Sequence, residues 1–280
     1  MKRTTLCLGI CATIAAISFN TTAANAQLWK KIKKKVSDKI ENKVDKALDG
    51  DFSKGTDNHT NSDNNGFKGV IGLSGPYIFT PGTDSIYFDQ FSHEKLGTMP
   101  RHWKTHGSGS IDKDDQFAGH WLYLNSFTSY KLKNDTALPE NFTVEFDIIT
   151  HSNEARDLEY FAFGFAKNNG VTGYIGGTSK SNATTYTQIH YWNQEIHNSS
   201  SDNDNHSSLD FPLAGYAIGK MHVAITVKGL HMQVYLDKHK VLDTDMFIRT
   251  PETKYFYISA PTRFDNGASI AVGNFKIAGL

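Results

Sequence analysis

Hydrophobic and polar residues alternate along residues 138–149, which are LPENFTVEFDII. Successive side chains of a strand point to opposite faces, so this segment presents two different faces. One face carries Phe142, Val144, Phe146 and Ile148, and the other carries Thr143, Glu145, Asp147 and Ile149. Pro139 has no N–H to donate to a sheet, so the strand should begin just after it. The pattern predicts a central strand with a buried apolar face and an exposed face that displays Glu145 and Asp147.

Short runs with strand-like composition recur between turn residues in the rest of the chain. They are residues 85–91, 121–124, 160–166, 185–192, 222–227, 231–236, 254–259 and 268–278. No long amphipathic helical pattern separates them, and many short strands without helical crossovers are typical of antiparallel sheets. The sequence therefore predicts a mainly β domain built as an antiparallel two-sheet sandwich.

The clearest strand pairing lies in residues 221–242, MHVAITVKGLHMQVYLDKHKVL. Apolar residues alternate with polar or small ones on both sides of a turn at Lys228-Gly229, and residues 237–239 form a second turn. Alternation on both sides of a short turn is typical of a β-hairpin. We expect a β-meander here, with one buried face.

The first 66 residues do not follow the strand pattern. Residues 1–26 combine a basic start, an apolar run over residues 6–19 and an Ala-Asn-Ala ending at Ala26. This is the layout of a cleaved secretory signal, and its apolar run is too short to span a membrane. We therefore predict an exported protein whose mature chain begins at Gln27.

Residues 27–50 are predicted to form an isolated amphipathic helix. Apolar residues recur every four positions from Leu28 to Leu48, so the apolar line winds around the helix. The lysine-rich first half and Trp29 suit peripheral membrane contact through residues 28–48. The alternative is a solvated helix that docks on the sandwich or pairs with a copy of itself, and we favour it because lysine runs are usually solvated.

Polar residues dominate the segment that follows the predicted helix. Residues 51–66, DFSKGTDNHTNSDNNG, have almost nothing to bury and are predicted to be a flexible linker. The chain therefore divides into a signal, a helix, a linker and a sandwich over residues 67–280.

Charge and cysteine content narrow the function. The chain has 29 Lys and Arg residues and 29 Asp and Glu residues. Loss of the signal removes two basic residues, which leaves a net charge of −2 and does not suit a nucleic-acid binder. Both cysteines, Cys7 and Cys11, lie in the signal, so the mature chain has no thiol for a disulfide or a metal site. Lipid attachment at Cys11 is an alternative to cleavage after Ala26.

Three runs of the sequence resemble a known family. They are YIFTPGTDSIYFDQFSHEKLGTMPRHW at residues 77–103, LPENFTVEFDI, and VKGLHMQVYLDKHKVLD. Together they are similar to the concanavalin A-like or laminin G-like sandwich in the N-terminal part of OmpA-like outer-membrane proteins of Bacteroidetes. The resemblance covers about residues 77–278. It implies a jelly roll in which the first strand (86–91) and the last strand (270–277) lie together.

The resemblance does not extend to wall anchoring. Those relatives continue into a C-terminal peptidoglycan-binding domain, whereas this sequence ends at Leu280. We therefore do not expect the function of that domain here.

The two carboxylates of the central segment resemble part of a catalytic motif. Some glycoside hydrolases with this sandwich carry Glu-x-Asp-x-Glu on one strand, and Glu145-Phe146-Asp147 opens in the same way. The positions that follow are Ile149 and Thr150, so the second carboxyl group that a retaining mechanism needs is missing. We expect Glu145 and Asp147 to pair with cross-strand Lys or Arg instead. A glycoside hydrolase-like enzyme, with Glu154, Asp157 or Glu159 of the following loop as the second carboxyl group, remains the alternative.

A second alternating segment, residues 184–192, is rich in aromatic and amide side chains. Tyr186, Gln188, His190 and Trp192 share one of its faces. Aromatic rings cover the apolar side of a pyranose while Gln and His bind its hydroxyl groups, so this face suits a sugar. Tyr160, Asn193, Gln194 and Glu195 are expected to extend the site. The alternative is that these are ordinary sheet residues, because β-sheets favour aromatic side chains.

Metal ligands are not evident in the sequence. Twelve histidines are present, but none lies in an HExxH motif. Asp202, Asp204 and Asn205 lie in a polar loop that lacks the turn glycine of a calcium site, and we expect this loop to be mobile. We predict no metal or cofactor, with weak calcium binding as the alternative.

Together these features predict an exported protein of the cell envelope, in the periplasm or at the outer membrane. Its lectin-like sandwich is expected to bind a glycan or a protein partner without catalysis. The alternatives are a glycoside hydrolase-like enzyme and a structural component of the envelope.

Overall fold

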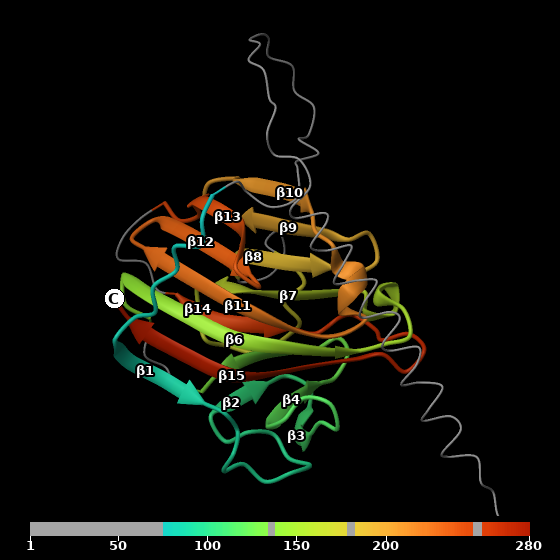
Figure 1. The fold of residues 1–280 in the computed structure, drawn as a ribbon. Helices are drawn as coiled ribbons and strands as arrows, with labels where there is room; N and C mark the ends of the chain where they lie inside the picture. The colour runs from blue at the N-terminus through green and yellow to red at the C-terminus, as the bar shows by residue number, and fades with distance from the viewer. Residues whose placement is uncertain (1–74, 134–137, 178–182, 249–253) are drawn as a thin grey trace, which may run out of the picture. The chain divides into compact units, whose positions relative to one another are not determined.

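The computed structural model describes residues 75–133, 138–177, 183–248 and 254–280, and these residues form two antiparallel sheets packed face to face (Figure 1). The first sheet has the order β13 (His239–Asp245), β12 (His231–Leu236), β11 (Ile218–Lys228), β6 (Asn141–His151), β15 (Ser269–Gly279), β4 (His120–Leu124) and β3 (Gly109–Lys113), and β1 (Asp84–Asp89) also pairs with β15. The second sheet has the order β10 (His206–Asp210), β9 (Glu195–Ser200), β8 (Ala183–His190), β7 (Tyr160–Ala166), β14 (Tyr255–Ser259), β5 (Ser129–Leu132) and β2 (Trp103–Thr105). The predicted two-sheet sandwich is confirmed.

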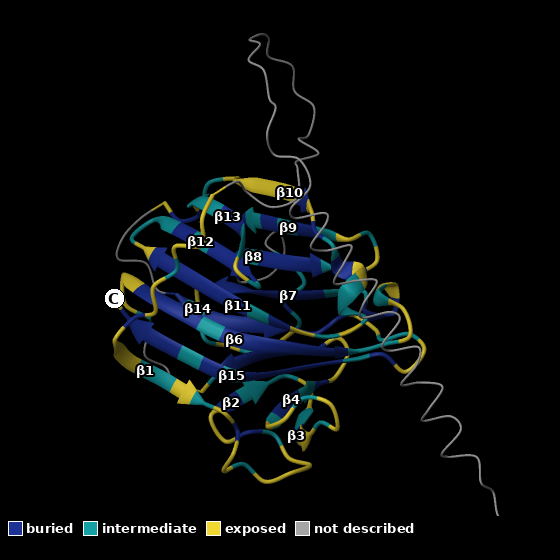
Figure 2. Ribbon diagram, in the orientation of Figure 1, coloured by how far each residue is buried: buried dark blue, intermediate teal, exposed yellow. Residues whose placement is uncertain are grey.

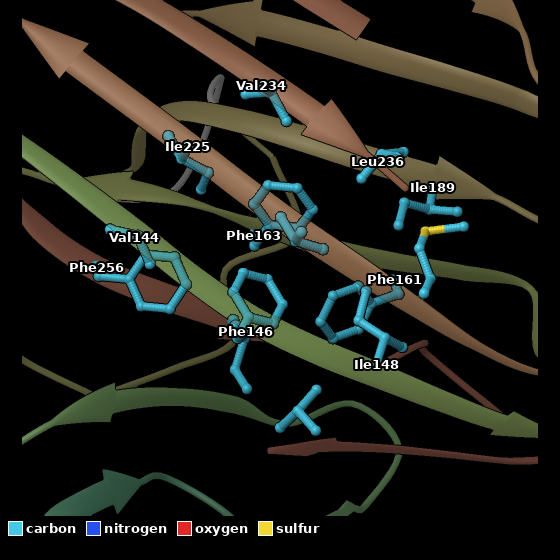
Figure 3. Close-up of a cluster of buried hydrophobic side chains, with 14 of the residues drawn as sticks. Val144, Phe146, Ile148, Phe161, Phe163, Ile189, Ile225, Val234, Leu236 and Phe256 are labelled. Carbon is cyan, nitrogen blue, oxygen red and sulfur yellow. The ribbon is translucent and has the colours of Figure 1, made fainter. Parts of the chain in front are cut away.

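The hydrophobic core lies between the two sheets. Phe142, Val144, Phe146 and Ile148 of β6 are fully buried there, as the alternation predicts. The ring of Phe146 contacts Phe163 of the opposite sheet at 5.3 Å between centroids and stacks on Phe275 of β15 at 5.2 Å. Figure 3 shows Phe146 and Phe163 close together among the buried side chains, and Figure 2 shows that burial is concentrated on the central strands. Aromatic side chains therefore join the two layers.

The predicted meander and the pairing of the terminal strands are both confirmed. β11 pairs with β12 through Val223↔Leu236 and Val227↔Met232, and β12 continues into β13. β1 lies antiparallel to β15, as the family resemblance implies. β6 begins at Asn141, just after Pro139.

The outer face of β6 differs from the prediction. Asp147, Thr143 and Ile149 are buried, so the expected exposure of Asp147 is wrong, and Glu145 is only half-exposed. At one end of β6 the chain before β1 crosses the sheet, and the Gly82 N–H donates to Thr143 Oγ1 at 2.9 Å. The other end is covered by a small apolar cluster of Trp121, Ile149 and Ala271. A central strand is thus enclosed on both faces by segments distant in sequence.

Five described strands lie outside the predicted set: β2, β3, β5, β9 and β10. β2 is three residues long, and β10, HSSLD, has one buried residue. Short or polar strands of this kind carry no apolar alternation because little of their surface is buried. Two short 3₁₀ helices, η1 (Ala155–Leu158) and η2 (Leu213–Tyr216), complete the described elements.

The predictions for the signal (1–26), the helix (27–50) and the linker (51–66) lie outside the described residues, as do residues 67–74 of the predicted sandwich. No described helix has the length and apolar character needed to cross a membrane.

Candidate functional site

The candidate site lies on the outer face of the second sheet, where β7 begins and β8 ends. Ile189 of β8 is buried in the core, so Gln188 and His190 on either side of it face outward. The register pairs Tyr160 of β7 with His190 of β8. Two predicted site residues that are 30 positions apart in sequence are therefore adjacent across the sheet.

His190 stands at the centre of a stack of rings. Tyr160 stacks on it at 5.5 Å between centroids and 20° between planes. His197 of β9 stacks on it at 4.1 Å and 26°. Glu195 Oε2 accepts hydrogen bonds from His197 Nε2 (2.7 Å) and Asn193 Nδ2 (2.8 Å). The predicted site thus continues onto β9, a strand that the hydrophobic pattern does not reveal.

Gln188 determines the tautomer of His190. Gln188 Nε2 donates to Gly176 O at 2.9 Å, so Gln188 Oε1 is the atom that accepts from His190 Nε2 at 3.0 Å. A neutral imidazole has one N–H, so Nδ1 of His190 is unprotonated. Burial lowers the pKa of His190 to about 4, and nearby His197 acts in the same direction while Glu195 opposes it. His190 is therefore neutral at pH 7.

Trp192 lies beyond the end of β8, so its predicted place on that strand is wrong. β8 ends at His190, and Trp192 belongs to the turn that leads into β9. Its ring meets His190 at 6.3 Å with 62° between planes. Trp192 is 60% exposed, which is unusual for so large an apolar side chain. The turn places the indole at the edge of a cleft rather than on the sheet surface.

A cleft of about 650 Å³ opens beside Trp192 and Tyr160. Residues 156–159, around η1, and residues 262–266, between β14 and β15, form its polar walls. Glu159 Oε1 pairs with Arg263 Nε at 2.7 Å, and Glu159 Oε2 accepts from Thr262 Oγ1 at 2.8 Å. These contacts join the two loops, so the walls of the cleft are fixed by side-chain hydrogen bonds.

The loop residues of the cleft are absent from the predicted ligand-binding site, although Asp157 and Glu159 are candidate carboxylates for the hydrolase alternative. In the sequence, the loop around η1 is marked only by a group of charged residues after β6. Nothing in the sequence indicates that Arg263 or Thr262 lies near this loop. Asp157 likewise accepts a hydrogen bond from Asn266 Nδ2 at 3.1 Å. The tertiary fold alone brings these two loops together.

Tyr186 and Gln188 share the outer face of β8 but do not line the cleft. Residues 171–177 cover that part of the sheet: the Ile175 N–H donates to Ser129 Oγ at 2.8 Å, and Ile175 packs in a small cluster beside Tyr186. Gln188 is buried under the same segment and binds Gly176. Of the five predicted ligand-binding residues, Tyr160 and Trp192 line the cleft and His190 supports both of them.

Glu145 and Asp147 lie on the other sheet, within an ion-pair network. Lys276 Nζ is 3.5 Å from Glu145 Oε1, and Lys220 Nζ is 3.2 Å from Asp147 Oδ2, so the predicted pairing with cross-strand lysine is confirmed. His222, directly opposite Asp147 on β11, adds a contact that the sequence analysis missed, with Nδ1 2.7 Å from Asp147 Oδ1.

The network also shifts the pKa values of its members. Hydrogen bonds to Asp147 and Glu145 raise the pKa of His222 to about 9. The hydrogen bond from His222 lowers the pKa of Glu145. Burial acts to raise the pKa of Asp147, but hydrogen bonds from His222 and Asn274 and the charge of Lys220 bring it below its ordinary value. The two carboxylates are thus held ionised by surrounding cations.

The described residues contain no cluster of His, Cys, Asp and Glu able to hold a metal ion. In the loop considered for calcium, Asp202 Oδ1 pairs with Lys167 Nζ at 2.9 Å. Asn205 Nδ2 donates to Asp245 O at 2.6 Å. Both side chains therefore have partners within the protein.

The architecture is an antiparallel two-sheet β-sandwich. No family model matches the sequence, and no curated protein matches it. Among solved structures, the carbohydrate-binding module CBM66 from Bacillus subtilis is 14% identical, with a TM-score of 0.43, over 66% of this chain and 100% of that one. The carbohydrate recognition domain of Emp47p is 13% identical, with a TM-score of 0.49, over 69% of this chain and 94% of that one.

A third similar structure is a protein of unknown function with a galectin-like fold from Bacillus subtilis. It is 9% identical, with a TM-score of 0.48, over 71% of this chain and 97% of that one. At these identities the likeness concerns the fold alone. The resemblance to OmpA-like proteins stays an expectation from the sequence.

Proposed function

We propose that this protein is a non-catalytic, lectin-like protein of the cell envelope that binds a glycan in the cleft beside Trp192 and Tyr160. The observation that carries the proposal is the 60% exposed indole of Trp192 at the edge of a polar cleft. When a sugar ring stacks on an exposed indole, apolar surface of the indole is removed from water. The cleft and the ring together therefore suit a ligand that is apolar on one side and rich in hydroxyl groups on the other.

The walls of the cleft supply the hydrogen-bonding part of such a site. Arg156 and Arg263 are held at Nε by Glu154 and Glu159, at 2.7 Å in each case. A guanidinium group has five N–H donors, so each arginine retains donors for a ligand. Because these side chains are already fixed by their partners, binding would order few additional groups.

Binding without catalysis is favoured by the state of the carboxylates. A glycosidase needs a carboxylic acid whose pKa is raised so that it can donate a proton. The pKa values of Glu145 and Asp147 are instead lowered by their cationic neighbours. They also lie on the first sheet, whereas the cleft opens on the second. No contact among the described residues therefore supports these two as an acid and nucleophile pair.

Export is part of the proposal and rests on the sequence of residues 1–26. Intact-mass measurement of the protein from its native envelope should find Gln27 as the first residue. Retention of Met1 would contradict export, and a lipid on Cys11 would contradict cleavage after Ala26.

A glycan array probed with the mature chain tests the binding function. Calorimetry on the strongest hit then compares the wild-type protein with Trp192→Ala and Phe88→Ala. Phe88 is a matched control because it is 62% exposed but lies on β1 of the first sheet. We expect Trp192→Ala to weaken binding at least about tenfold, or about 1.4 kcal/mol, and Phe88→Ala to leave it unchanged.

The same samples distinguish the other functions. Absence of any glycan hit, or equal binding by Trp192→Ala and wild type, would contradict a glycan site at the cleft. Shortened glycan products that accumulate with time would show an enzyme instead.

A further inference from the structure

Five rings form a continuous line across one end of the second sheet. We call this line the aromatic row, and its members in spatial order are Trp192, His190, Tyr160, Tyr174 and Phe127. The outer pair Tyr174 and Phe127 is stacked at 4.6 Å between centroids and 22° between planes. Tyr160 and Tyr174 are joined by a 3.1 Å hydrogen bond between their hydroxyl groups. The row therefore extends well past the cleft beside Trp192.

Phe127, at the far end of the row, has an unusual conformation. Its φ is 53°, in the left-handed region that bulky residues rarely adopt. Hydrogen bonds hold it there: its N–H donates to Pro261 O at 2.7 Å, and its carbonyl oxygen lies 3.1 Å from His106 Nε2. The ring that this backbone presents is 58% exposed. Strained, exposed residues of this kind concentrate at functional sites.

The rings at the two ends of the row are exposed to solvent, and the three rings between them are less exposed. Trp192 and Phe127 are the most exposed rings, whereas Tyr160, Tyr174 and His190 are half-buried. Tyr174 is held down by the hydrogen bond from its hydroxyl group to Ala260 O at 2.8 Å. The result is a floor of half-buried rings between two exposed ones.

The length of the row follows from the strand order. Trp192 follows β8 and Phe127 precedes β5, and the intervening neighbours in the sheet are β7 and β14. Three spacings of about 4.8 Å between adjacent strands give about 14 Å. This is longer than a single pyranose ring and corresponds to a short chain of sugars.

We propose that the aromatic row is one extended site for a linear oligosaccharide, in which Phe127 stacks on a sugar several units away from the one on Trp192. This rests on the proposed glycan-binding function and specifies a chain rather than a single terminal sugar as the ligand. The hydroxyl groups of Tyr160 and Tyr174 and the polar walls of the cleft interrupt the apolar surface. Such a mixture suits a sugar chain better than a lipid surface, which would require a contiguous apolar patch.

Length dependence of binding is the test. The mature protein is titrated by calorimetry with β-1,4-linked oligomers of glucose and of N-acetylglucosamine, one to six units long, and with the same length series of the strongest array hit. We expect the hexamer of at least one series to bind about tenfold more tightly than its dimer. Phe127→Ala should abolish this gain and leave dimer binding unchanged, while Trp192→Ala should weaken both.

Three further variants control for folding. Phe127→Tyr keeps the ring and should retain the gain with length. Phe127→Gly removes the ring in a residue that adopts positive φ freely, so it should behave like Phe127→Ala without added strain. Phe88→Ala, which removes an equally exposed ring from the other sheet, should bind like the wild type.

The outcomes separate this inference from the function on which it rests. Binding that depends on Trp192 but not on chain length or Phe127 overturns the extended site and leaves the glycan-binding function intact. Absence of binding to every glycan overturns both. Loss of binding to phosphatidylglycerol vesicles in Phe127→Ala, with sugar binding unaltered, would assign Phe127 to a membrane surface and also overturn the extended site.

Discussion

The outer faces of the two sheets are built from the same strand alternation but use it differently. On the first sheet, Glu145 and Asp147 of β6 are surrounded by His222, Lys220 and Lys276, and their charges are satisfied within the protein. On the second sheet, the outward side chains lead to exposed rings beside a cleft. We call the outer face that carries Glu145 and Asp147 the closed face, because its charged groups already have partners within the protein. We call the outer face that leads to Trp192 and Tyr160 the open face, because its rings lie beside a cleft.

The difference shows that chemical type alone does not identify a site. Carboxylates draw attention because they can act as acids and bases, yet here cross-strand cations hold them ionised and fixed. Trp192 and Phe127 carry no charge, but their exposure leaves them free to contact a ligand. What distinguishes the two faces is whether the outward groups already have partners within the fold.

The largest expected effect comes from the core that both faces share. Phe146→Ala removes a fully buried ring between the sheets and leaves a cavity, which should cost about 3–5 kcal/mol of unfolding free energy. Denaturant unfolding measures this loss. A change as small as that of Phe88→Ala, whose exposed ring should contribute about 0.5 kcal/mol or less, would show that the inward assignment of Phe146 is wrong.

A smaller effect is expected at the closed face. Asp147→Ala removes a buried carboxylate that accepts hydrogen bonds from His222, Lys220 and Asn274. One hydrogen bond to a charged group contributes about 1.5–3 kcal/mol, and water can replace the bonds of the partly exposed Lys220 and His222 side chains, so unfolding free energy should fall by about that amount while glycan binding is retained. If Asp147→Ala instead abolished a glycan-cleaving activity without changing stability, the closed face would be catalytic.

The pH dependence of stability should have opposite signs on the two faces. The folded-state pKa of His222 is raised to about 9, so its contribution is complete below pH 6.5 and is lost as pH rises through 9. The folded-state pKa of His190 is lowered to about 4, so its contribution is complete above pH 6.5 and is lost as pH falls toward 4.

Substitution of either histidine should remove the part of the pH dependence of unfolding free energy that this histidine contributes. His222→Gln should flatten the loss of unfolding free energy between pH 6.5 and 9, and His190→Gln should flatten the part of the acid limb between pH 6.5 and 4. Lowered pKa values at Glu145 and Asp147 add a separate acid loss, because the unfolded carboxylates bind protons as pH falls through their ordinary range of about 4, before the folded ones do. Unchanged profiles in both variants would contradict the charge states assigned to the two faces.

The smallest effect on stability is expected at the open face. Trp192→Ala should change unfolding free energy by about 0.5 kcal/mol or less, because its ring is largely exposed and lies in a turn. Thermal unfolding alongside Asp147→Ala provides the measurement. A large destabilisation by Trp192→Ala would mean that the indole supports the fold, and it would weaken the contrast between the faces.

Much of the fold was predictable because apolar and polar residues alternate along a strand that buries one of its faces. β6, β11 and β12 were found from alternation, β7 was found from its strand-like composition, and the turns between β11, β12 and β13 were found from their residues. The candidate site was predictable only in part. Tyr160 and Trp192 line the cleft, but Tyr186 lies under residues 171–177 and Trp192 lies beyond its expected strand.

The sequence by itself determined which side chains of the central strands enter the core, since that choice depends on alternation between neighbouring residues. Tertiary structure alone decided what covers the other side. It placed His222 opposite Asp147, residues 262–266 beside residues 156–159, and Phe127 against Tyr174 at the far end of the aromatic row from Trp192. These arrangements depend on contacts between segments far apart in the chain, and local periodicity carries no information about which distant segments will meet.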